Sequence, residues 1–543
     1  MATEKRLTRA QLVALEKARK GLLVAHTLKS PPGHTATLAD FGFPELEELV
    51  APGGEVFALQ GSTWWEEVTC VGLHPDSSSL EAVVSIKRPT GYSGDLCTNG
   101  SAEYVRFFVD WGSGFEDVGL ASFRAHDISE APPGPQHPIQ HRVAIELDDE
   151  SYRRYCKQEV VVRARAILSW NQVPPSDPNH TPIFGNRVDA AIQIDPREIQ
   201  IIDLFDDALL PENVLPLFDK IDLEAPLTKK PEPTPVPLEQ MKAAREAGVE
   251  DHRLLCDIVC PLIDPAMAEH ANVLQPDLDK LGELGFDLDQ VIEVLQEPAS
   301  NTGYEELVCV GLDSRTDTLG AVVRIKRPQG YGGRLCQKGS REFVAFWIDW
   351  NGDGDFVGDY VGTASVEVHD IRSIPAEGID YAVHLPIPRR LIEKHLRGCE
   401  RPNVVRIRAV LSWSVPPSNV DPNQPTFWGN RLDRLVRLRV APGQGIQPEL
   451  YFVGGVPVED IHPTSHLAYP SGGAFLGGCA QPLTDRPYAG VVTFRGRIHG
   501  IPTTSTVHYQ VQYSPKGQNA WAPVSTSETF RLDVPLSPVV QIV

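Results

Sequence analysis

The segment from Asp349 to Asp355 carries oxygen-bearing side chains at every second position. These are Asp349, Asn351, Asp353 and Asp355, with glycine at 352 and 354. Such spacing lets a short loop wrap several oxygens around one hard cation, and glycine permits the sharp turn that this needs. Asp359 is a further candidate ligand, because Tyr360 stands where an EF-hand loop would place its closing glutamate. The sequence predicts a calcium site; the alternative is a hairpin of turn-forming residues that binds no ion.

The residues before this loop alternate as in a strand, with Phe343, Ala345 and Trp347 on one face, so the loop is not an EF-hand. The ten residues 347–356 resemble the Trp-x-Asp-Trp-Asn-x-Asp-Gly-x-Phe segment of GEVED-type β-sandwich modules, which occur in bacterial surface proteins. The resemblance implies a calcium-binding module with an adhesive or accessory role.

The chain contains an internal repeat. Between residues 86–103 and 325–342, twelve of eighteen positions are identical, whereas unrelated segments would share about one. The match extends to the segments 70–73 and 309–312, 166–170 and 409–413, and 185–187 and 429–431. The offset grows from 239 to 243 residues by a four-residue insertion after Trp350. The first copy has Gly112, Ser113 and Gly114 in place of the ligands, so only the second copy is predicted to hold calcium.

Three cysteines recur in the two copies: Cys70 with Cys309, Cys97 with Cys336, and Cys156 with Cys399. With no secretory signal, burial as reduced thiols is the expectation. Two alternatives remain open. One is a single disulfide within each copy, from Cys97 to Cys156 and from Cys336 to Cys399, and the other is zinc held by three cysteines and His126 or His369.

Other candidate groups favour structural roles. His252, Cys256 and Cys260 fall along one side of a helix among apolar residues, which indicates a core-facing stripe. The Lys-Arg-Pro-x-Gly-Tyr-x-Gly segments, 87–94 and 326–333, lack the ending of a phosphate-binding loop and are expected to shape a turn, with a ligand-binding loop as the alternative. His126 and Asp127 are neighbours on a strand and point to opposite faces, so they predict no catalytic dyad. No catalytic motif occurs, so the sequence favours a non-catalytic protein over an enzyme.

The elements that carry these residues are predicted to be mainly strands. Val160 to Trp170 and Val405 to Trp413 alternate apolar and polar residues, which is typical of half-buried strands with one core face. The fold prediction is mainly β and multidomain. The predicted domains are a helical preamble (1–55), a first β-sandwich module (56–197), a Pro-rich linker (198–237), a second helical preamble (238–300), a second β-sandwich module (301–442) and an immunoglobulin- or fibronectin-like domain (443–543).

Composition narrows the classes of partner. A net charge of -22 argues against nucleic acid and anionic lipid, which both need surplus Lys and Arg. No apolar stretch is long enough for a transmembrane helix, and no secretory signal is visible, so the expectation is a cytoplasmic protein or one exported by a non-classical route.

Duplicated sandwiches extend a surface more readily than they build one active site. The sequence therefore predicts a non-catalytic structural or interaction protein with one calcium-stabilised loop and an unidentified protein or glycan partner, able to assemble into a larger complex. Two alternatives remain: a carbohydrate-binding or hydrolase-accessory protein with its pocket between the modules, and a component of a phage or toxin particle.

Overall fold

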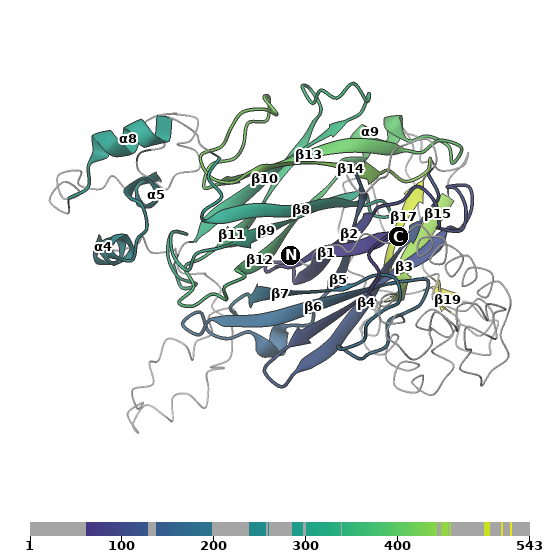
Figure 1. The fold of residues 1–543 in the computed structure, drawn as a ribbon, viewed down its shortest axis with the longest axis horizontal. Helices are drawn as coiled ribbons and strands as arrows, with labels where there is room; N and C mark the ends of the chain where they lie inside the picture. Colours follow the sequence, from purple (N-terminus) through teal and green to yellow (C-terminus); the bar gives the residue numbers. More distant parts are fainter. Residues whose placement is uncertain are drawn as a thin grey trace, which may run out of the picture.

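A computed structural model of the chain describes residues 61–128, 137–197, 238–256, 259, 285–296, 300–337, 339–441, 447–453, 456–457, 494–499, 512–513 and 522–523. The structure is mainly β, as the sequence predicts, with the strands gathered into a central body and α4, α5 and α8 to one side of it (Figure 1). The predicted first preamble and Pro-rich linker lie outside the described residues. Among the described residues, no helix is long and apolar enough to cross a membrane.

Each module contains seven strands in the same order along the chain. In the first module they are β1 (Glu66–His74), β2 (Ser79–Ile86), β3 (Ser101–Asp110), β4 (Phe115–Ala125), β5 (Ile139–Glu146), β6 (Val160–Trp170) and β7 (Arg187–Ile194). In the second they are β8 (Glu305–Asp313), β9 (Thr318–Ile325), β10 (Ser340–Asp349), β11 (Tyr360–Val368), β12 (Ile379–Pro386), β13 (Val404–Trp413) and β14 (Arg431–Arg437).

Within a module, a three-stranded sheet faces a four-stranded one. The orders are β5-β2-β1 and β4-β3-β6-β7 in the first module, and β12-β9-β8 and β11-β10-β13-β14 in the second, where β14 also pairs in parallel with β5 of the first module at Leu435 and Ile139. Apolar side chains from both sheets fill the space between them, such as Val84 and Phe107 in the first module and Val323 and Phe346 in the second. Each module is therefore a β-sandwich.

The strand β6 is more buried than its alternating pattern predicts. From Ala164 to Trp170 every residue is buried, on both faces. The outer face is covered by the loop after the strand, where the carbonyl of Pro178 accepts a hydrogen bond of 2.8 Å from Arg165 Nη1. A polar residue on an outer face is thus covered by a neighbouring loop, which sequence alternation does not reveal.

The two three-stranded sheets meet and close into a ring of six strands. β1 pairs in parallel with β12 at Leu73 and Tyr381, and β5 pairs in parallel with β8 at His141 and Leu312. These two contacts are equivalent, because β1 corresponds to β8 and β5 to β12. Exchanging the modules therefore maps the ring onto itself, as in an isologous two-fold contact.

Glycine allows the backbones to meet at both contacts. A Cβ at Gly72 would stand 3.2 Å from the backbone nitrogen of Ala382, and a Cβ at Gly311 would stand 3.1 Å from that of Arg142. The two glycines occupy equivalent positions in the repeat. Their conformations need no positive φ; what they supply is room for a neighbouring strand.

Three disulfides cross from one module to the other: Cys70–Cys309, Cys97–Cys399 and Cys156–Cys336. The first joins two cysteines that are equivalent in the repeat. The other two bonds are equivalent to each other, because Cys97 corresponds to Cys336 and Cys399 corresponds to Cys156. The prediction of reduced, buried thiols is wrong for these six residues, and so are the alternatives of one disulfide within each module and of zinc. The predictions treated each module as pairing its own three cysteines, whereas in the structure the cysteines of one module face those of the other.

The structure describes helices in the segment before the second module. They are α4 (Leu238–Glu246), α5 (Asp251–Leu254) and α8 (Leu288–Gln296). Leu255, Cys256 and Val259 are buried, as the core-facing stripe predicts, and Cys256 is itself disulfide-bonded. Cys260 lies outside the described residues.

Of the predicted C-terminal domain, the structure describes β15 (Gln447–Val453), β16 (Val456–Pro457), β17 (Phe494–His499), β18 (Gln512–Tyr513) and β19 (Ala522–Pro523). β15 pairs with β16 and β17, and β18 pairs with β19. The immunoglobulin-like architecture otherwise falls outside the described residues.

Arg253 fixes the helical preamble to the second module. Its guanidinium is fully buried, makes two hydrogen bonds of 2.7 and 2.9 Å to Glu305, and stacks 3.5 Å from the ring centre of Trp413. Burial alone would lower the pKa of Arg253, but the charge and hydrogen bonds of Glu305 outweigh burial and raise it. Nearby, burial and then Glu305 raise the pKa of Glu342 well above its usual value, which favours the protonated form of this carboxyl.

Replacing Arg253 by alanine is expected to destabilise the protein by about 3–5 kcal/mol, because it leaves the Glu305 carboxylate buried without a partner. The double variant Arg253→Met/Glu305→Gln should recover much of this loss. Arg245→Ala is the control, since its ion pair with Asp251 is partly exposed and worth about 1 kcal/mol or less. Urea unfolding measures all three, and equal losses for Arg253→Ala and Arg245→Ala would contradict the role given to Arg253.

Candidate functional site at the junction of the modules

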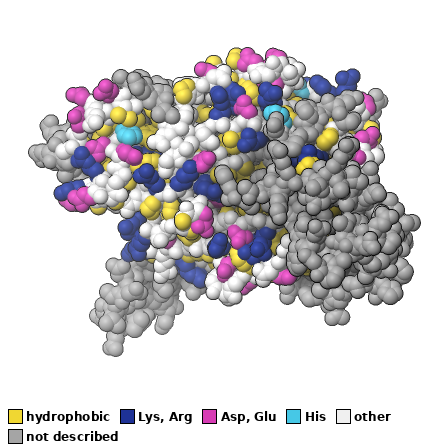
Figure 2. Space-filling view, viewed as in Figure 1, with side chains coloured by type: hydrophobic (Ala, Val, Ile, Leu, Met, Phe, Trp, Pro, Cys, Tyr) yellow, Lys and Arg dark blue, Asp and Glu magenta, His cyan; other side chains and the backbone are white. Residues whose placement is uncertain are grey.

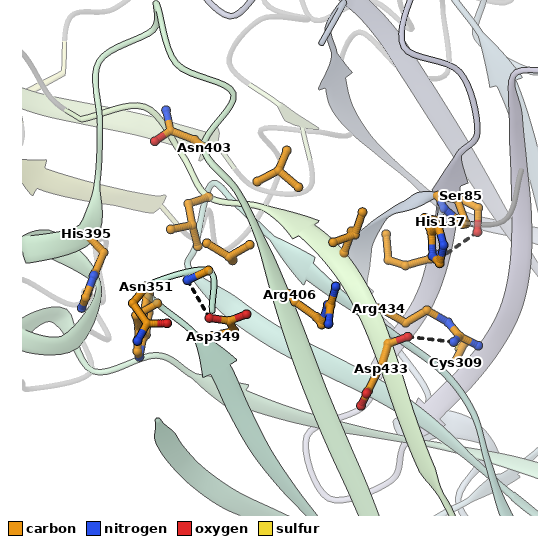
Figure 3. Close-up of a pocket in the computed structure, with 18 of the residues that line it drawn as sticks. Ser85, His137, Cys309, Asp349, Asn351, His395, Asn403, Arg406, Asp433 and Arg434 are labelled. Atoms are coloured by element: carbon orange, nitrogen blue, oxygen red, sulfur yellow. Dashed lines mark hydrogen bonds between the residues drawn. The ribbon is translucent and has the colours of Figure 1, made fainter. Parts of the chain in front are cut away.

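A cavity of about 1010 Å³ lies where the two modules meet. Ser85, His137 and Gln140 line it from the first module, and β10, β13 and β14 with the loops beside them line it from the second (Figure 3). The Cys70–Cys309 disulfide is close by, since Cys309 also lines the cavity. A cavity of this size accommodates a small organic molecule or several sugar units.

The cavity is rich in cationic side chains without carboxylate partners. Arg397, Arg406 and Arg434 line it, and none of the three forms an ion pair within the part of the chain that the structure describes. Arg434 Nη1 donates a hydrogen bond of 2.9 Å to the backbone carbonyl of Asp433, and its partial burial lowers its pKa. Figure 3 shows Arg406 between the loop that carries Asn351 and the strand that carries Arg434.

Both carboxylates of the cavity wall are already occupied. Asp433 receives two hydrogen bonds, of 2.7 and 2.6 Å, from Arg408 on the neighbouring strand. Asp349 receives them from the backbone amides of Gly352 and Gly354, at 2.7 and 3.0 Å. Neither carboxylate is therefore placed as a free acid or base, and the cavity presents surplus positive charge.

An aromatic platform forms one wall. The rings of Trp350 and His395 stack with their centres 4.4 Å apart and their planes 16° from parallel. Both residues line the cavity, and the Nε2 atom of His395 is buried without a hydrogen-bond partner. Burial first, and then the charges of Lys394 and Arg397, lower the pKa of His395, which favours its neutral form.

The predicted calcium residues form one loop beside this wall. Asn351 Nδ2 donates to Asp353 Oδ2 at 2.8 Å, and the backbone amide of Asp355 donates to Asp353 Oδ1, also at 2.8 Å. Burial raises the pKa of Asp359, and the negative charges of Asp349, Asp353 and Asp355 raise it further. A backbone hydrogen bond from Trp350 has the opposite effect and lowers it. The loop thus brings four carboxylates into electrostatic contact.

The same loop is also well satisfied by its own turns, because hydrogen bonds from its amides and from Asn351 reach Asp349, Asp353 and Asp355. Among the described residues, no group of three or more His, Cys, Asp or Glu side chains is arranged to hold a metal ion. In the first module, Asp110 Oδ1 accepts hydrogen bonds of 2.9 Å from Gly112 and Gly114, so the turn persists there without the other carboxylates.

The Lys-Arg-Pro-x-Gly-Tyr-x-Gly loops shape turns, as predicted. Asp127 accepts hydrogen bonds from the amides of Gly91 and Tyr92, at 2.6 and 2.8 Å. Asp370 does the same for Gly330 and Tyr331, at 2.8 Å each. His126 and Asp127 follow β4, which ends at Ala125, so the prediction that they are neighbours on a strand is wrong, and Asp127 is committed to the loop.

The junction contains a second cavity, of about 520 Å³, beside a buried ion pair that sequence reasoning missed. Glu81 makes two hydrogen bonds of 2.5 Å with Arg142 and one of 2.8 Å with His384 Nδ1 from the other module. Burial alone would raise the pKa of Glu81, but Arg142 and His384 outweigh it and lower it to about 2. A Cβ at Gly320, which stands at the position of Glu81 in the second copy, would lie 2.3 Å from Arg142 Cδ.

Arg437 is buried at the same junction without an ion-pair partner in the described parts of the chain. Its Nη2 donates to the carbonyl of Arg124 and to Ser314 Oγ, at 3.3 and 3.4 Å. Burial, and then the charge of Arg437, lower the pKa of His126 to about 4 and that of His141 well below its usual value. Gln193 is the residue at the equivalent position of the first module, where it accepts a hydrogen bond of 3.1 Å from Tyr381.

No family model and no curated protein matches the chain. Among solved structures, MtrC from Shewanella baltica OS185 is 9% identical, over 75% of this chain and 76% of that one, with a TM-score of 0.14. The β-glucosidase from Kluyveromyces marxianus, in complex with glucose, is 10% identical, over 67% of this chain and 46% of that one, also with a TM-score of 0.14. Scores this low establish no shared fold.

Acid is expected to destabilise the junction through His126 and His141. Because the pKa of His126 is about 4 when folded and about 6.5 when unfolded, the unfolded chain binds more protons between these values. Stability is therefore full above about pH 6.5 and falls as the pH drops towards 4, by up to about 1.4 kcal/mol per pH unit for each histidine.

Arg437→Gln, which installs the residue of the first module, should raise both histidine pKa values and flatten this dependence. Thermal melting between pH 7 and pH 4.5 measures it. Arg431→Gln, at an exposed arginine on the same strand, is the control. A slope that Arg437→Gln leaves unchanged would show that Arg437 does not set it.

Proposed function

We propose that this protein is a binding scaffold, built from two β-sandwich modules that disulfides lock into one rigid unit, and that it works in an oxidising compartment. The observation that carries the proposal is the disulfide pattern: all three bonds with two described partners join one module to the other. Disulfides persist outside the cytosol and are rare within it. The proposal therefore places the protein outside the cytoplasm, in contrast to the expectation from the sequence.

The cavity at the junction supports binding over catalysis. Its two carboxylates are held by Arg408 and by backbone amides, whereas acid–base catalysis needs groups free to exchange a proton. Its cations and its aromatic wall are suited to holding a ligand. Over the visible face of the molecule, basic and acidic side chains are interspersed (Figure 2), which gives no extended basic surface for nucleic acid.

A protease site inserted in the Pro-rich segment 229–237 tests the covalent lock. The cut chain should run as one species on a denaturing gel without reductant and as two species with it. Cys70→Ser/Cys97→Ser/Cys156→Ser is the control, because it removes one partner of each bond and should release the halves without reductant. If the unsubstituted halves separate without reductant, the scaffold proposal fails.

Calcium binding by the loop that ends at Asp359 is a second proposal. The charges of Asp349, Asp353 and Asp355, which add to burial in raising the pKa of Asp359, support it, because a divalent cation relieves repulsion among nearby carboxylates. The proposed ligands are the side chains predicted from the sequence, which are Asp349, Asn351, Asp353, Asp355 and Asp359. The cation would stiffen the loop that carries Trp350 and so steady the aromatic wall of the cavity.

The full-length protein should melt several degrees higher in millimolar calcium than in chelator. Binding stabilises the folded state by about 2.7 kcal/mol when calcium is a hundredfold above its dissociation constant. Asp353→Ala should abolish the difference, whereas Glu116→Ala, on the equivalent hairpin of the first module, should preserve it. Identical melting of the unsubstituted protein in calcium and in chelator would reduce this loop to a hairpin.

A further inference from the structure

The residues around Arg406 have equivalents at the other end of the junction, and the two ends differ in charge. Arg406 corresponds to Arg163, since their neighbours Ile407 and Ala164 pair with the equivalent residues Arg434 and Ala190. His137 corresponds to Glu377, because each stands two residues before an isoleucine, Ile139 or Ile379, that pairs with Ile86 or Ile325.

At the counterpart end, the arginine is neutralised across the junction. Arg163 Nη2 lies 3.6 Å from Glu377 and 3.9 Å from Asp189. Nearby, the backbone amide of Arg372 donates to Glu159 at 2.9 Å, which ties the modules together again. Acidic and basic groups are thus balanced at this end.

At the cavity end, two differences between the repeats change the balance of charge from neutral to positive. His137 stands where Glu377 would neutralise the arginine, and Arg434 stands where the other copy has Ala190. One negative charge is lost and one positive charge is gained, while Asp433 remains bound to Arg408. In a protein of net charge -22, this local surplus of cations is specific to one end of the junction.

We infer that this cavity binds an anionic oligosaccharide, with Arg397, Arg406 and Arg434 meeting its carboxylate or sulfate groups. Guanidinium groups bind both kinds of anion through paired hydrogen bonds. About 1010 Å³ is far more than one inorganic anion needs, and the stacked rings of Trp350 and His395 offer an apolar face to a sugar ring. Ser85 and Gln140, joined to each other by a hydrogen bond of 2.8 Å, add polar groups to the cavity wall on the side of the first module.

The inference rests on the proposed binding role and names the ligand class for it. Calorimetric titration of the full-length, oxidised protein with three probes tests it: a hexamer of galacturonate, a heparin-derived hexasaccharide and neutral maltohexaose. At least one acidic probe should bind, more weakly as salt is raised, and the neutral one should bind at least tenfold more weakly. Binding of the galacturonate hexamer would indicate carboxylate recognition, and binding of the heparin hexasaccharide alone would indicate that sulfate is needed, because heparin carries both groups.

Two substitutions convert the cavity end into its counterpart. His137→Glu supplies the carboxylate that neutralises Arg406, and Arg434→Ala installs the residue of the first module. Each should weaken binding of the acidic probe at least tenfold without lowering the melting temperature by more than a few degrees. Arg163→Gln, at the opposite end, is the control and should leave binding unchanged.

Absence of binding by both acidic probes, equal binding of maltohexaose, or unchanged binding in both cavity variants would overturn the inference. These failures are distinct from failure of the scaffold, because the linker-cleavage gel reads the covalent lock without any ligand. Halves that stay joined in a protein that binds no acidic glycan would refute the ligand class alone.

Discussion

The closed ring of six strands is the constraint on which the rest of the structure depends. Each module contributes three strands, and a parallel pair on either side joins the two sets, so neither set is complete without the other. An edge strand that pairs inside the molecule offers no free backbone for aggregation. Glycine at 72 and 311 leaves room for this pairing, because a Cβ at either position would stand only 3.2 or 3.1 Å from the backbone of the strand that closes the ring.

The closed ring places the disulfides and the buried charges. Cys70 and Cys309 occupy equivalent strands, so closure brings them face to face, and their neighbours Val83 and Val322 complete a small apolar cluster. Because the two modules are equivalent in the ring, the other two bonds depend on each other: pairing Cys97 with Cys399 implies pairing Cys336 with Cys156. Long loops closed by disulfides restrict the unfolded chain most, by about 5–6 kcal/mol for each bond taken alone in the entropy model.

The two ends of the junction have diverged although the ring of six strands is symmetric, and β14 pairs with β5 at one end only among the described strands. Glu81 and Arg142 form a buried ion pair where the other copy has Gly320 and Ala382, and a Cβ at Gly320 would intrude on it. Arg437 stands where the first copy has Gln193, and His137 where the second has Glu377. Duplication thus provided two equivalent junction ends, and substitution gave each its own electrostatics. A repeated module can acquire a single binding site in this way.

The sequence by itself determined the β-sandwich class, the repeat and the turn chemistry, because these depend on local periodicity and on short-range hydrogen bonds. The alternation in β6 and β13, the glycines of the Lys-Arg-Pro loops and the helix at Leu288–Gln296 are all readable within a dozen residues. The candidate ligands from Asp349 to Asp355 likewise lie in one loop, as their spacing requires, and their affinity for calcium is a separate property that spacing does not fix.

Only the tertiary structure decided how the cysteines pair and where the cavity lies. Cys97 and Cys399 are 302 residues apart, and their Cα atoms approach to 4.9 Å because the modules face each other across the ring. Nothing in the spacing of cysteines within one copy encodes a contact with the other copy. The same holds for Arg406, which reads as an ordinary strand residue until His137, from the other module, is seen to stand where a glutamate neutralises its counterpart.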